Sequence, residues 1–468
     1  MSETETLFVA LRQSSDGGVV DMLERMVRHA PDHALNKMNA LDLAAKEGLD
    51  EERLIATLLN AVGLGMLEMT WSVMCPSCAG VLSANKTLKT VNRAQYNCAF
   101  CAAGYETTLD NLVEVTFTVS PRVRKIAAHS PDELSPAEYY RQIFWSSAID
   151  LPDDPEKLLD EVTLEIVDLP PGERAILSLH APEGTLIVFD PVTHAAQFLH
   201  VRGEEASERQ NLSVIFNKVQ ASVETVALRP GPLRLALENR TESRVLPAVW
   251  VGNQALDDLL TRRKPILTAK RLLTNQTFRD IYRTDTLAIG QHLKILSLTF
   301  LFSDLRGSTE LYERVGDLTA FDLVNEHFRL LQEIIASERG AIVKTIGDAV
   351  MATFETPDRA IAAAIRMREA MSDLGAERAH QSLGLKMGIH EGSCLAVTLN
   401  AQQDYFGQTV NIASRVQGLA ASRSIVVTES VVENAQARAL LETNGLKPTP
   451  KRVALSGIAD KISVFEIA

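Results

Sequence analysis

The 468-residue sequence has only five cysteines and an aromatic content of 5%. It also lacks a long hydrophobic run, because apolar stretches such as Ile295 to Phe302 are far too short to cross a bilayer. The first ten residues, MSETETLFVA, lack the basic start and the apolar core of a signal peptide. We therefore expect a soluble protein of the cytoplasm that has no membrane partner.

Positive charge is also scarce. The chain has 47 Lys and Arg against 60 Asp and Glu, and its formal net charge is −13 at pH 7. Because nucleic-acid-binding proteins normally carry a basic face, this balance argues against nucleic acid as a partner. The hydrophobic content of 46% and the charged content of 23% are ordinary for a globular protein. The length suffices for about two to four domains with cores of their own.

The N-terminal pattern is helical. Residues 1–20 are polar and are expected to fray, whereas residues 19–71 predict a winged-helix-like module. Its parts are a helix at 39–48, a second helix at 51–62 and a strand at 65–71. The second helix would be the DNA-recognition helix, but DEERLIATLLNAV carries one arginine and three acids, which suits phosphates poorly. We therefore favour a packing or dimerisation module over DNA binding.

Four cysteines form two CxxC pairs within residues 72–112. They are Cys75, Cys78, Cys98 and Cys101. This spacing predicts a zinc ribbon that holds a structural Zn²⁺. Disulfides are disfavoured in a reducing cytoplasm, and a redox CxxC would not need two copies. Four sulfur ligands leave no open coordination position, so we expect no zinc catalysis, and the metal would replace a core that the segment lacks. The fifth cysteine, Cys394, is expected to be a small buried residue.

Residues 113–255 predict a β-rich, sandwich-like regulatory domain whose ligand or protein partner is unknown. Besides a strand at 113–119, short alternating runs separated by turn residues indicate seven strands. These runs are Ala175 to His180, Thr185 to Phe189, Ala196 to Val201, Leu212 to Asn217, Ser222 to Leu228, Leu233 to Glu238 and Val245 to Val251. His180, His194 and His200 could form a metal site, but surface histidines are the simpler interpretation. Residues 256–293 predict a helical connector that packs on its neighbours or transmits strain.

Residues 294–468 carry three motifs. The first, LSLTFLFSDLRGST, predicts a buried strand that ends at Asp304, and then a turn around Gly307 where a phosphate could sit. The second, AIVKTIGDAVMATF, predicts a tight hairpin at Gly347 and Asp348. The two aspartates could hold divalent metal between them, because hard cations prefer carboxylate oxygens. The third motif, DYFGQTVNIASR, begins at Asp404.

Together these motifs resemble the catalytic domain of the class III nucleotide cyclases, from about Ser297 to the C-terminus. The resemblance implies an α+β, ferredoxin-like fold and cyclisation of a nucleoside triphosphate. The upstream half resembles, more loosely, the N-terminal region of some soluble bacterial cyclases, in which a helical segment, a cysteine pair motif and the run NQTFRD precede the catalytic domain.

The resemblance also implies the site residues. Asp304, Asp348 and a backbone carbonyl near Leu305 would hold two Mg²⁺ or Mn²⁺ ions per active site. Asn411 would orient the ribose, and Arg415, one helical turn later, would meet the charge that develops on the phosphate. The basic residue that holds the triphosphate stays open, with Lys461 and Arg452 as candidates.

The purine is the most discriminating part of the resemblance. Lys344 and Asp404 occupy the positions that contact the base, and they fit adenine, because aspartate accepts from N6 and lysine donates to N1. Guanylyl members use residues such as glutamate and cysteine instead. We therefore predict a soluble adenylate cyclase that uses ATP, with its sites shared across a homodimer and regulated by the N-terminal half. The alternative is a weak or inactive cyclase-fold nucleotide sensor or regulatory protein.

Overall fold

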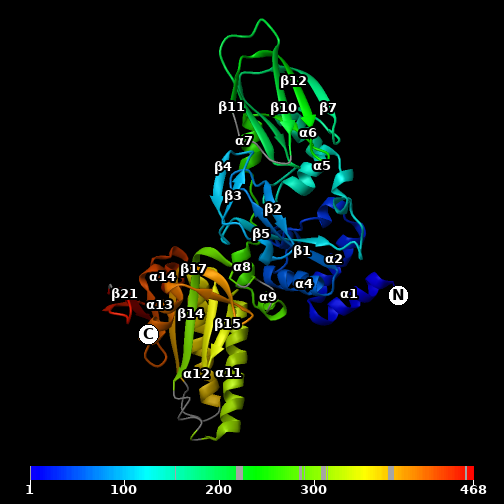
Figure 1. Ribbon diagram of the computed structural model, residues 1–468. Helices are drawn as coiled ribbons and strands as arrows, with labels where there is room; N and C mark the ends of the chain where they lie inside the picture. Colours follow the sequence, from blue (N-terminus) through cyan, green and yellow to red (C-terminus); the bar gives the residue numbers. More distant parts are fainter. Residues whose placement is uncertain are drawn as a thin grey trace. The chain divides into compact units, whose positions relative to one another are not determined.

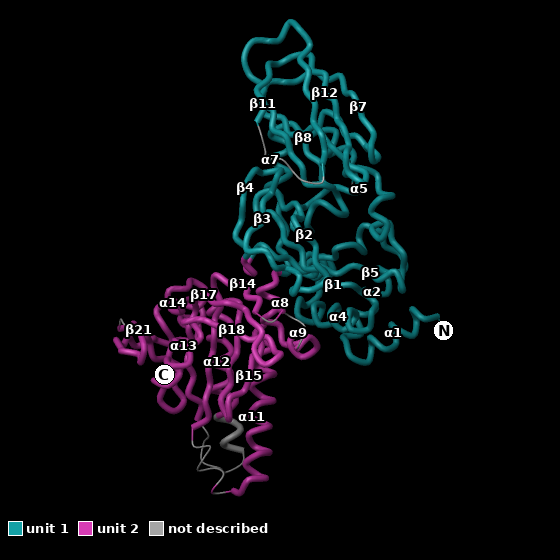
Figure 2. Tube along the Cα trace, in the orientation of Figure 1, with its two compact units in different colours: residues 1–107, 111–267 teal, residues 108–110, 268–468 magenta. Residues whose placement is uncertain are grey.

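The structure is a computed structural model, and it describes residues 2–152, 154–217, 225–283, 287–288, 290–306, 313, 315–377, 384–458 and 461–467. The chain forms two compact units, coloured separately in Figure 2. The N-terminal unit comprises residues 1–107 and 111–267, and the C-terminal unit comprises residues 108–110 and 268–468. The segment predicted as a connector, 256–293, is thus divided between them.

Helices open the N-terminal unit. α1 spans Glu3–Ser14, α2 Gly17–His29, α3 Ala40–Glu47 and α4 Glu51–Gly63. The helices predicted at 39–48 and 51–62 are confirmed, and α3 ends at Gly48 in the left-handed conformation that favours glycine (φ 65°). The expectation that residues 1–20 fray is wrong, because Ser2 and Glu5 form a capping box and α1 buries apolar side chains against its neighbours.

A three-stranded sheet follows in the order β2-β1-β5. β1 spans Leu67–Met74, β2 Val81–Asn85 and β5 Val113–Val119, and the last of these confirms the strand predicted at 113–119. β3 (Gln95–Cys98) and β4 (Ala103–Glu106) form a separate hairpin. The remaining helices of this unit are short: α5 Pro136–Tyr139, continued by a π-helical turn at Tyr140–Phe144, α6 Pro155–Val162 and α7 Gln254–Thr261.

The rest of the N-terminal unit has two mixed sheets around one core, whose strands Figure 1 shows in green. One sheet has the order β10-β12-β7 and the other β11-β9-β8-β13-β6. The strands are β6 Thr163–Ile166, β7 Arg174–Ala181, β8 Gly184–Asp190, β9 Ala195–Val201, β10 Gln210–Phe216, β11 Thr225–Leu228, β12 Gly231–Asn239 and β13 Ala248–Val251. Each of the seven predicted strands overlaps an observed one, although residues 218–224 lie outside the described part. Among the described strands of these two sheets, β6, which is short and has no buried residue, is the one that was not predicted.

The C-terminal unit is an α+β domain on one large sheet. Its strand order is β15-β16-β14-β17-β19-β21-β20, and β18 pairs with β17 off this path. The strands are β14 His292–Arg306, β15 Ala341–Ile346, β16 Ala349–Phe354, β17 Gly384–Leu399, β18 Gln402–Phe406, β19 Ile425–Thr428, β20 Thr449–Val453 and β21 Ile462–Ile467. The helices are α8 Ala269–Leu273, α9 Gln276–Ile281, α11 Asp317–Ser337, α12 Pro357–Glu377, α13 Gln408–Gln417, α14 Glu429–Glu433 and α15 Ala435–Thr443. Side chains of α11, α12 and α15 share a core with the sheet.

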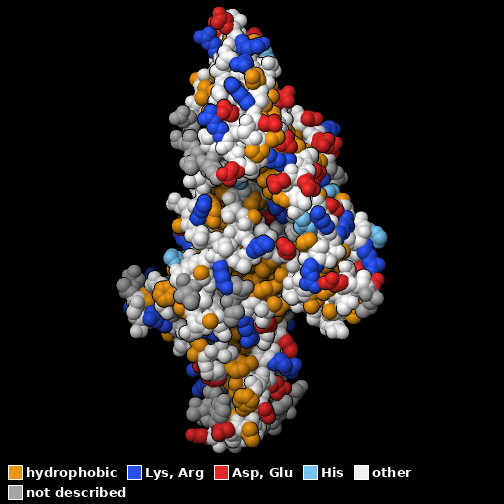
Figure 3. All heavy atoms as spheres, turned by 45° about the vertical axis from the view of Figure 1, so that its right-hand side comes forward, with side chains coloured by type: hydrophobic (Ala, Val, Ile, Leu, Met, Phe, Trp, Pro, Cys, Tyr) orange, Lys and Arg blue, Asp and Glu red, His pale blue; other side chains and the backbone are white. Residues whose placement is uncertain are grey.

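Two surface properties bear on the expected partners. No described helix combines the length and the apolar character that a membrane span requires. On the face shown in Figure 3, basic side chains are interspersed with acidic ones.

Candidate active site

Strand pairing brings the two predicted metal carboxylates close together. In the β14–β16 ladder Ser303 lies opposite Val350, so Asp304 reaches the turn that carries Asp348. The predicted hairpin is confirmed, with Gly347 at φ 64° between β15 and β16. β14 continues to Arg306, so Asp304 lies inside the strand rather than at its end. The predicted phosphate turn from Gly307 to Thr309 lies outside the described residues.

The electrostatics of this pair suit a cation. Burial, together with the charge of Asp348, raises the pKa of Asp304, while Lys386 and the side chain of Gln417 act in the opposite direction. Both carboxylates are half-buried, so each keeps solvent access. Two acids that repel each other at a partly open edge form a donor set that a hard divalent ion would fit. Leu305, whose carbonyl is the expected third ligand, has a buried side chain.

The predicted purine residues form a direct ion pair. Lys344 Nζ lies 2.5 Å from Asp404 Oδ2. The other oxygen of Asp404 accepts a hydrogen bond from the backbone N–H of Tyr405, at 2.8 Å. The Asp404 side chain is only 10% exposed and that of Lys344 is 40% exposed. The structure therefore joins the second motif to the third through the two side chains that were expected to select the base.

Helix α13 carries the predicted transition-state residues. Asn411 is exposed, and Arg415 is half-buried one turn further along the same helix. The Arg415 guanidinium lies against Gly457, since a Cβ atom added to that glycine would be 3.4 Å from Nη2. Of the two candidates for holding the triphosphate, Arg452 lies on β20 and Lys461 precedes β21, and both are exposed.

The sequence reasoning missed one residue near the carboxylates. His327 on α11 is fully buried, and its Nδ1 lies 3.2 Å from the sulfur of Met371. Burial lowers the pKa of His327 to about 4, and the charge of Asp348 opposes that shift. A signal did exist, because the histidine lies in the apolar stripe of α11 between Leu323 and Leu331.

The four predicted zinc ligands are brought together in the N-terminal unit. Their sulfur atoms lie within 4.8 Å of one another, and among the described residues no other group of three or more His, Cys, Asp or Glu could hold a metal ion. The sulfur of Cys78 lies 3.6 Å from that of Cys98, and the sulfur of Cys75 lies 3.8 Å from that of Cys101. The three histidines considered at 180, 194 and 200 form no such group, and Cys394 is buried as expected.

The cysteine pairs lie in knuckle-like turns packed into an aromatic core. Ala79 and Ala102, each directly after a CxxC pair, have positive φ values of 53° and 50°. The ring of Phe100, inside the second pair, lies 5.1 Å from that of Phe189 and 5.3 Å from that of Trp250. A metal here would therefore add to a substantial core, whereas the sequence had suggested that it replaces one.

Comparison with known proteins agrees with this geometry. A family model described as "Adenylate and Guanylate cyclase catalytic domain" matches residues 291–454. The C-terminal part of the chain is therefore a class III cyclase domain. A second family model, the family of unknown function DUF5939, matches residues 1–280, which is more than half of the chain. The chain therefore belongs to the DUF5939 family.

The relatives include both kinds of cyclase. An adenylate cyclase of Anabaena cylindrica is 32% identical over 185 residues, which are 36% of each chain. Adenylate cyclase 2 of Rhizobium meliloti is 29% identical over 223 residues, 45% of this chain and 59% of the relative. Human retinal guanylyl cyclase 1 is 28% identical over 191 residues, 38% of this chain and 16% of the relative. The chain thus spans less than two thirds of each of these relatives.

Solved structures that resemble the chain include the adenylyl cyclase CyaB of P. aeruginosa and the guanylyl cyclase Cya2. CyaB has a TM-score of 0.34 and 24% identity, over 38% of this chain and 96% of that chain. Cya2 has a TM-score of 0.33 and 20% identity, over 38% of this chain and 93% of that chain.

Proposed function

We propose that this protein is an adenylate cyclase that converts ATP to 3',5'-cyclic AMP and pyrophosphate. The ion pair between Lys344 and Asp404 is the observation that carries the proposal. Lysine can donate to adenine N1 and aspartate can accept from N6, whereas guanine presents the opposite groups at these positions. Because the pair is already formed and Asp404 is nearly buried, the two side chains face an incoming base together.

The reaction is an internal displacement. The ribose 3'-oxygen forms a bond to the α-phosphorus, and the bond between the α-phosphorus and the bridging oxygen breaks, so that pyrophosphate leaves with that oxygen and the 3'-proton passes to water. Asn411 orients the ribose for in-line attack, and Arg415 meets the negative charge on the α-phosphate. Asp304, Asp348 and the Leu305 carbonyl would hold two Mg²⁺ or Mn²⁺ ions, which would neutralise the triphosphate and lower the pKa of the 3'-hydroxyl.

We further propose that the enzyme acts as a homodimer in the cytoplasm. The resemblance to class III cyclases implies that the metal carboxylates of one protomer meet the purine and transition-state residues of its partner. Two equivalent sites would then lie across a two-fold axis. The N-terminal half would regulate activity by changing the geometry of the dimer in response to a ligand or protein partner.

The cysteine cluster is proposed to bind structural Zn²⁺ through Cys75, Cys78, Cys98 and Cys101. Four sulfur atoms within 4.8 Å of one another suit the tetrahedral coordination of this ion. The hydroxyl of Tyr105, 3.6 Å from the sulfur of Cys75, would donate to a ligating thiolate. With four protein ligands the site would be closed, so its role would be in folding rather than in catalysis.

The test is cyclic nucleotide production by the purified full-length protein, with ATP or GTP, and with Mg²⁺ or Mn²⁺, over a range of protein concentrations. We expect cyclic AMP from ATP and a specific activity that rises as dimer forms. The double variant Lys344→Glu, Asp404→Cys should reverse the preference toward GTP. Nucleotide binding without product under all of these conditions would favour the sensor, and equal use of both nucleotides by the unaltered protein would refute adenine selection.

A further inference from the structure

Helix α9 holds the edge strand β15 through two side chains that lie one helical turn apart. Gln276 Oε1 accepts a hydrogen bond from the backbone N–H of Ile342, at 2.8 Å. Arg279 Nε donates to the carbonyl of the same residue, at 3.1 Å. Since β15 is the outermost strand on its side of the sheet, α9 satisfies backbone groups that a further strand would otherwise pair with.

Arg279 also reaches a second strand. The β15–β16 register shifts between Ile342 and Lys344, so Val343 is the extra residue of a β-bulge. Arg279 Nη2 donates to the carbonyl of Val343 at 3.3 Å and to that of Gln403, on β18, at 2.9 Å. We call Lys344 and Asp404 the purine pair. One acceptor, Val343, directly precedes Lys344, and the other, Gln403, directly precedes Asp404.

The sheet itself does not join these two strands. β15 pairs with β16, and β18 pairs with β17. The two strands are therefore connected near the purine pair by the Arg279 guanidinium and by the ion pair itself. Arg279 is only 9% exposed, and its guanidinium carbon lies 5.9 Å from the ring centroid of Tyr405 on β18. The guanidinium is planar and presents several N–H donors. A buried arginine with three carbonyl partners therefore fixes backbone positions more tightly than a lysine could.

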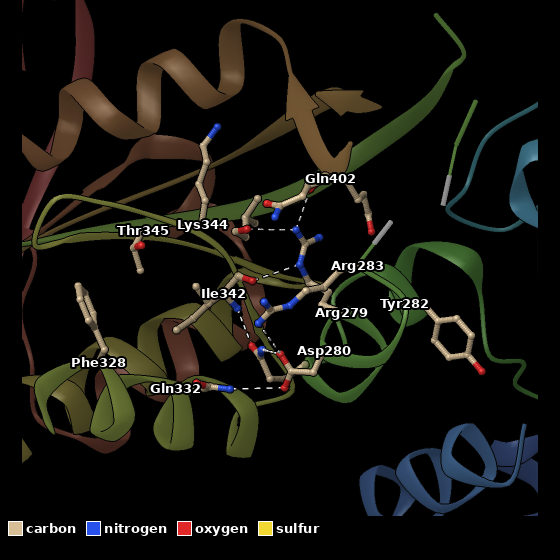
Figure 4. A pocket seen from close by; sticks show the side chains of 13 residues that line it. Arg279, Asp280, Tyr282, Arg283, Phe328, Gln332, Ile342, Lys344, Thr345 and Gln402 are labelled. Carbon is tan, nitrogen blue, oxygen red and sulfur yellow. Dashed lines mark hydrogen bonds and ion pairs between the residues drawn. The ribbon is translucent and has the colours of Figure 1, made fainter. Parts of the chain in front are cut away.

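Figure 4 shows that the Lys344 side chain extends away from the Arg279 guanidinium, although both residues line the same cavity. Arg279 therefore acts on the purine pair through the backbone. The guanidinium lies in the wall of a cavity of about 390 Å³ that is also lined by Arg283 and Gln332. The Arg283 side chain is 69% exposed and contacts Asp280 at 3.9 Å, so it offers a matched arginine on the same cavity.

We propose that Arg279 is a positioning residue for adenine selection, which sets the separation of β15 and β18 so that Lys344 and Asp404 meet. The inference rests on the proposed function and extends it. Arg279 lies within the stretch matched by the DUF5939 model, residues 1–280, and outside the stretch matched by the cyclase model, residues 291–454. A residue of the N-terminal family thus holds the base-selecting residues of the cyclase domain in place.

The kinetic test compares Arg279→Gln, Arg279→Lys and the control Arg283→Gln, with ATP and with GTP. Losing a charged donor to several buried carbonyls should lower kcat/KM for ATP by about 30-fold, mainly through KM, in the glutamine variant. The ATP-over-GTP preference should fall by about tenfold. Arg279→Lys should show a smaller loss in the same direction, and Arg283→Gln should stay within about twofold of the unaltered protein. An equal fall for ATP and GTP would overturn the proposal.

A double-mutant cycle with Lys344→Ala separates positioning from general stability. If Arg279 acts through the purine pair, Arg279→Gln should change kcat/KM for ATP by less than about twofold once Lys344 is gone. If the two losses multiply, Arg279 has only a structural role. Should Arg279→Gln fail to fold, as judged by thermal melting, the same cycle is run with Arg279→Lys, and its outcome decides.

A readout without turnover separates this proposal from the proposed function. An amine-reactive reagent should label Lys344 slowly while its ammonium is paired with Asp404, and its rate can be followed by mass spectrometry. We expect the labelling rate to rise several-fold in Arg279→Gln and to stay unchanged in Arg283→Gln. If the unaltered protein makes no cyclic nucleotide, the proposed function fails while this measurement still decides the positioning role. Equal labelling in all variants would overturn it.

Discussion

The two groups of candidate metal ligands in this protein differ in almost every physical respect. The four cysteines are soft ligands, three of them buried, and they lie beside packed aromatic rings. Asp304 and Asp348 are hard ligands, half-buried, in a strand and in a turn, and they supply only two side chains. A closed tetrahedral site maintains a fold, whereas a partly open carboxylate pair leaves coordination positions for a substrate.

The two groups also differ in how they affect stability when no ion is bound. Burial and the neighbouring carboxylate raise the pKa of Asp304, so the ionised pair opposes folding slightly until a cation arrives. Metal binding by the cysteines, which lie in a buried apolar core, would instead be coupled to folding, so loss of their ion should lower stability. Removing the cysteines should therefore affect mainly stability, and removing the two aspartates should affect mainly activity.

The largest effect is expected at the four-cysteine cluster, the closed site. Cys78→Ser should abolish zinc binding and lower the free energy of unfolding of the N-terminal unit by about 5 kcal/mol, because metal binding there is coupled to folding. Zinc content by elemental analysis and denaturant unfolding measure both. Cys394→Ser is the matched control: it replaces a buried thiol outside the cluster and should leave the zinc content unchanged. A well-folded, metal-free unaltered protein would contradict the proposal.

The carboxylate pair of Asp304 and Asp348, the open site, should lose activity and keep its stability. Asp348→Asn removes half of the carboxylate pair, and cyclic AMP production should fall by about 1000-fold, which corresponds to about 4 kcal/mol in the barrier. The melting temperature should not fall. Asp317→Asn, at an exposed helix start, serves as the control and should retain full activity. If Asp348→Asn kept more than a tenth of the activity, the metal assignment would have to be abandoned.

Local signals account for what the sequence predicted well. Gly48 ends a helix and Gly347 forms a hairpin, because each adopts a backbone conformation that few other residues tolerate. The CxxC spacing predicted which sulfurs would meet. The missed helix α1 had a readable signal too, the capping box of Ser2 and Glu5, but the polar composition of the first residues obscured it.

Long-range contacts account for what the sequence could not supply. Residues 108–110 follow the cysteine hairpin in the chain but belong to the C-terminal unit. There Asp110 accepts from the backbone N–H of Leu296 at 2.6 Å and from Lys270 Nζ at 3.2 Å, at the β14 bulge. Similarly, the sequence shows Arg279 only as a basic residue within the predicted connector, because the backbone carbonyls that it contacts lie more than 60 positions later in the chain. The Lys344–Asp404 pair was anticipated only through the family resemblance.

A smaller effect is expected from His327, which is buried near the open site. Its pKa in the folded protein is lowered to about 4, so the unfolded chain binds a proton first as the pH falls. Its contribution is fully present above about pH 6.5 and is lost as the pH falls toward 4, by up to about 3 kcal/mol. His327→Gln should flatten the pH dependence of unfolding of the C-terminal unit in this window. His292→Gln, at an exposed position on β14, should leave it unchanged.

The smallest effect is expected from Asp304 in the absence of metal. Its pKa is raised in the folded protein, so its contribution to stability falls as the pH rises from the unfolded value of about 3.9 through the folded value. Asp304→Asn should therefore raise the free energy of unfolding at neutral pH, by less than about 1 kcal/mol, because solvent screens a half-buried group. Adding Mn²⁺ should reverse the order, since only the unaltered protein gains stability from the ion. A variant that is less stable than the unaltered protein without metal would mean that Asp304 supports the fold, and the contrast between the two sites would then not hold.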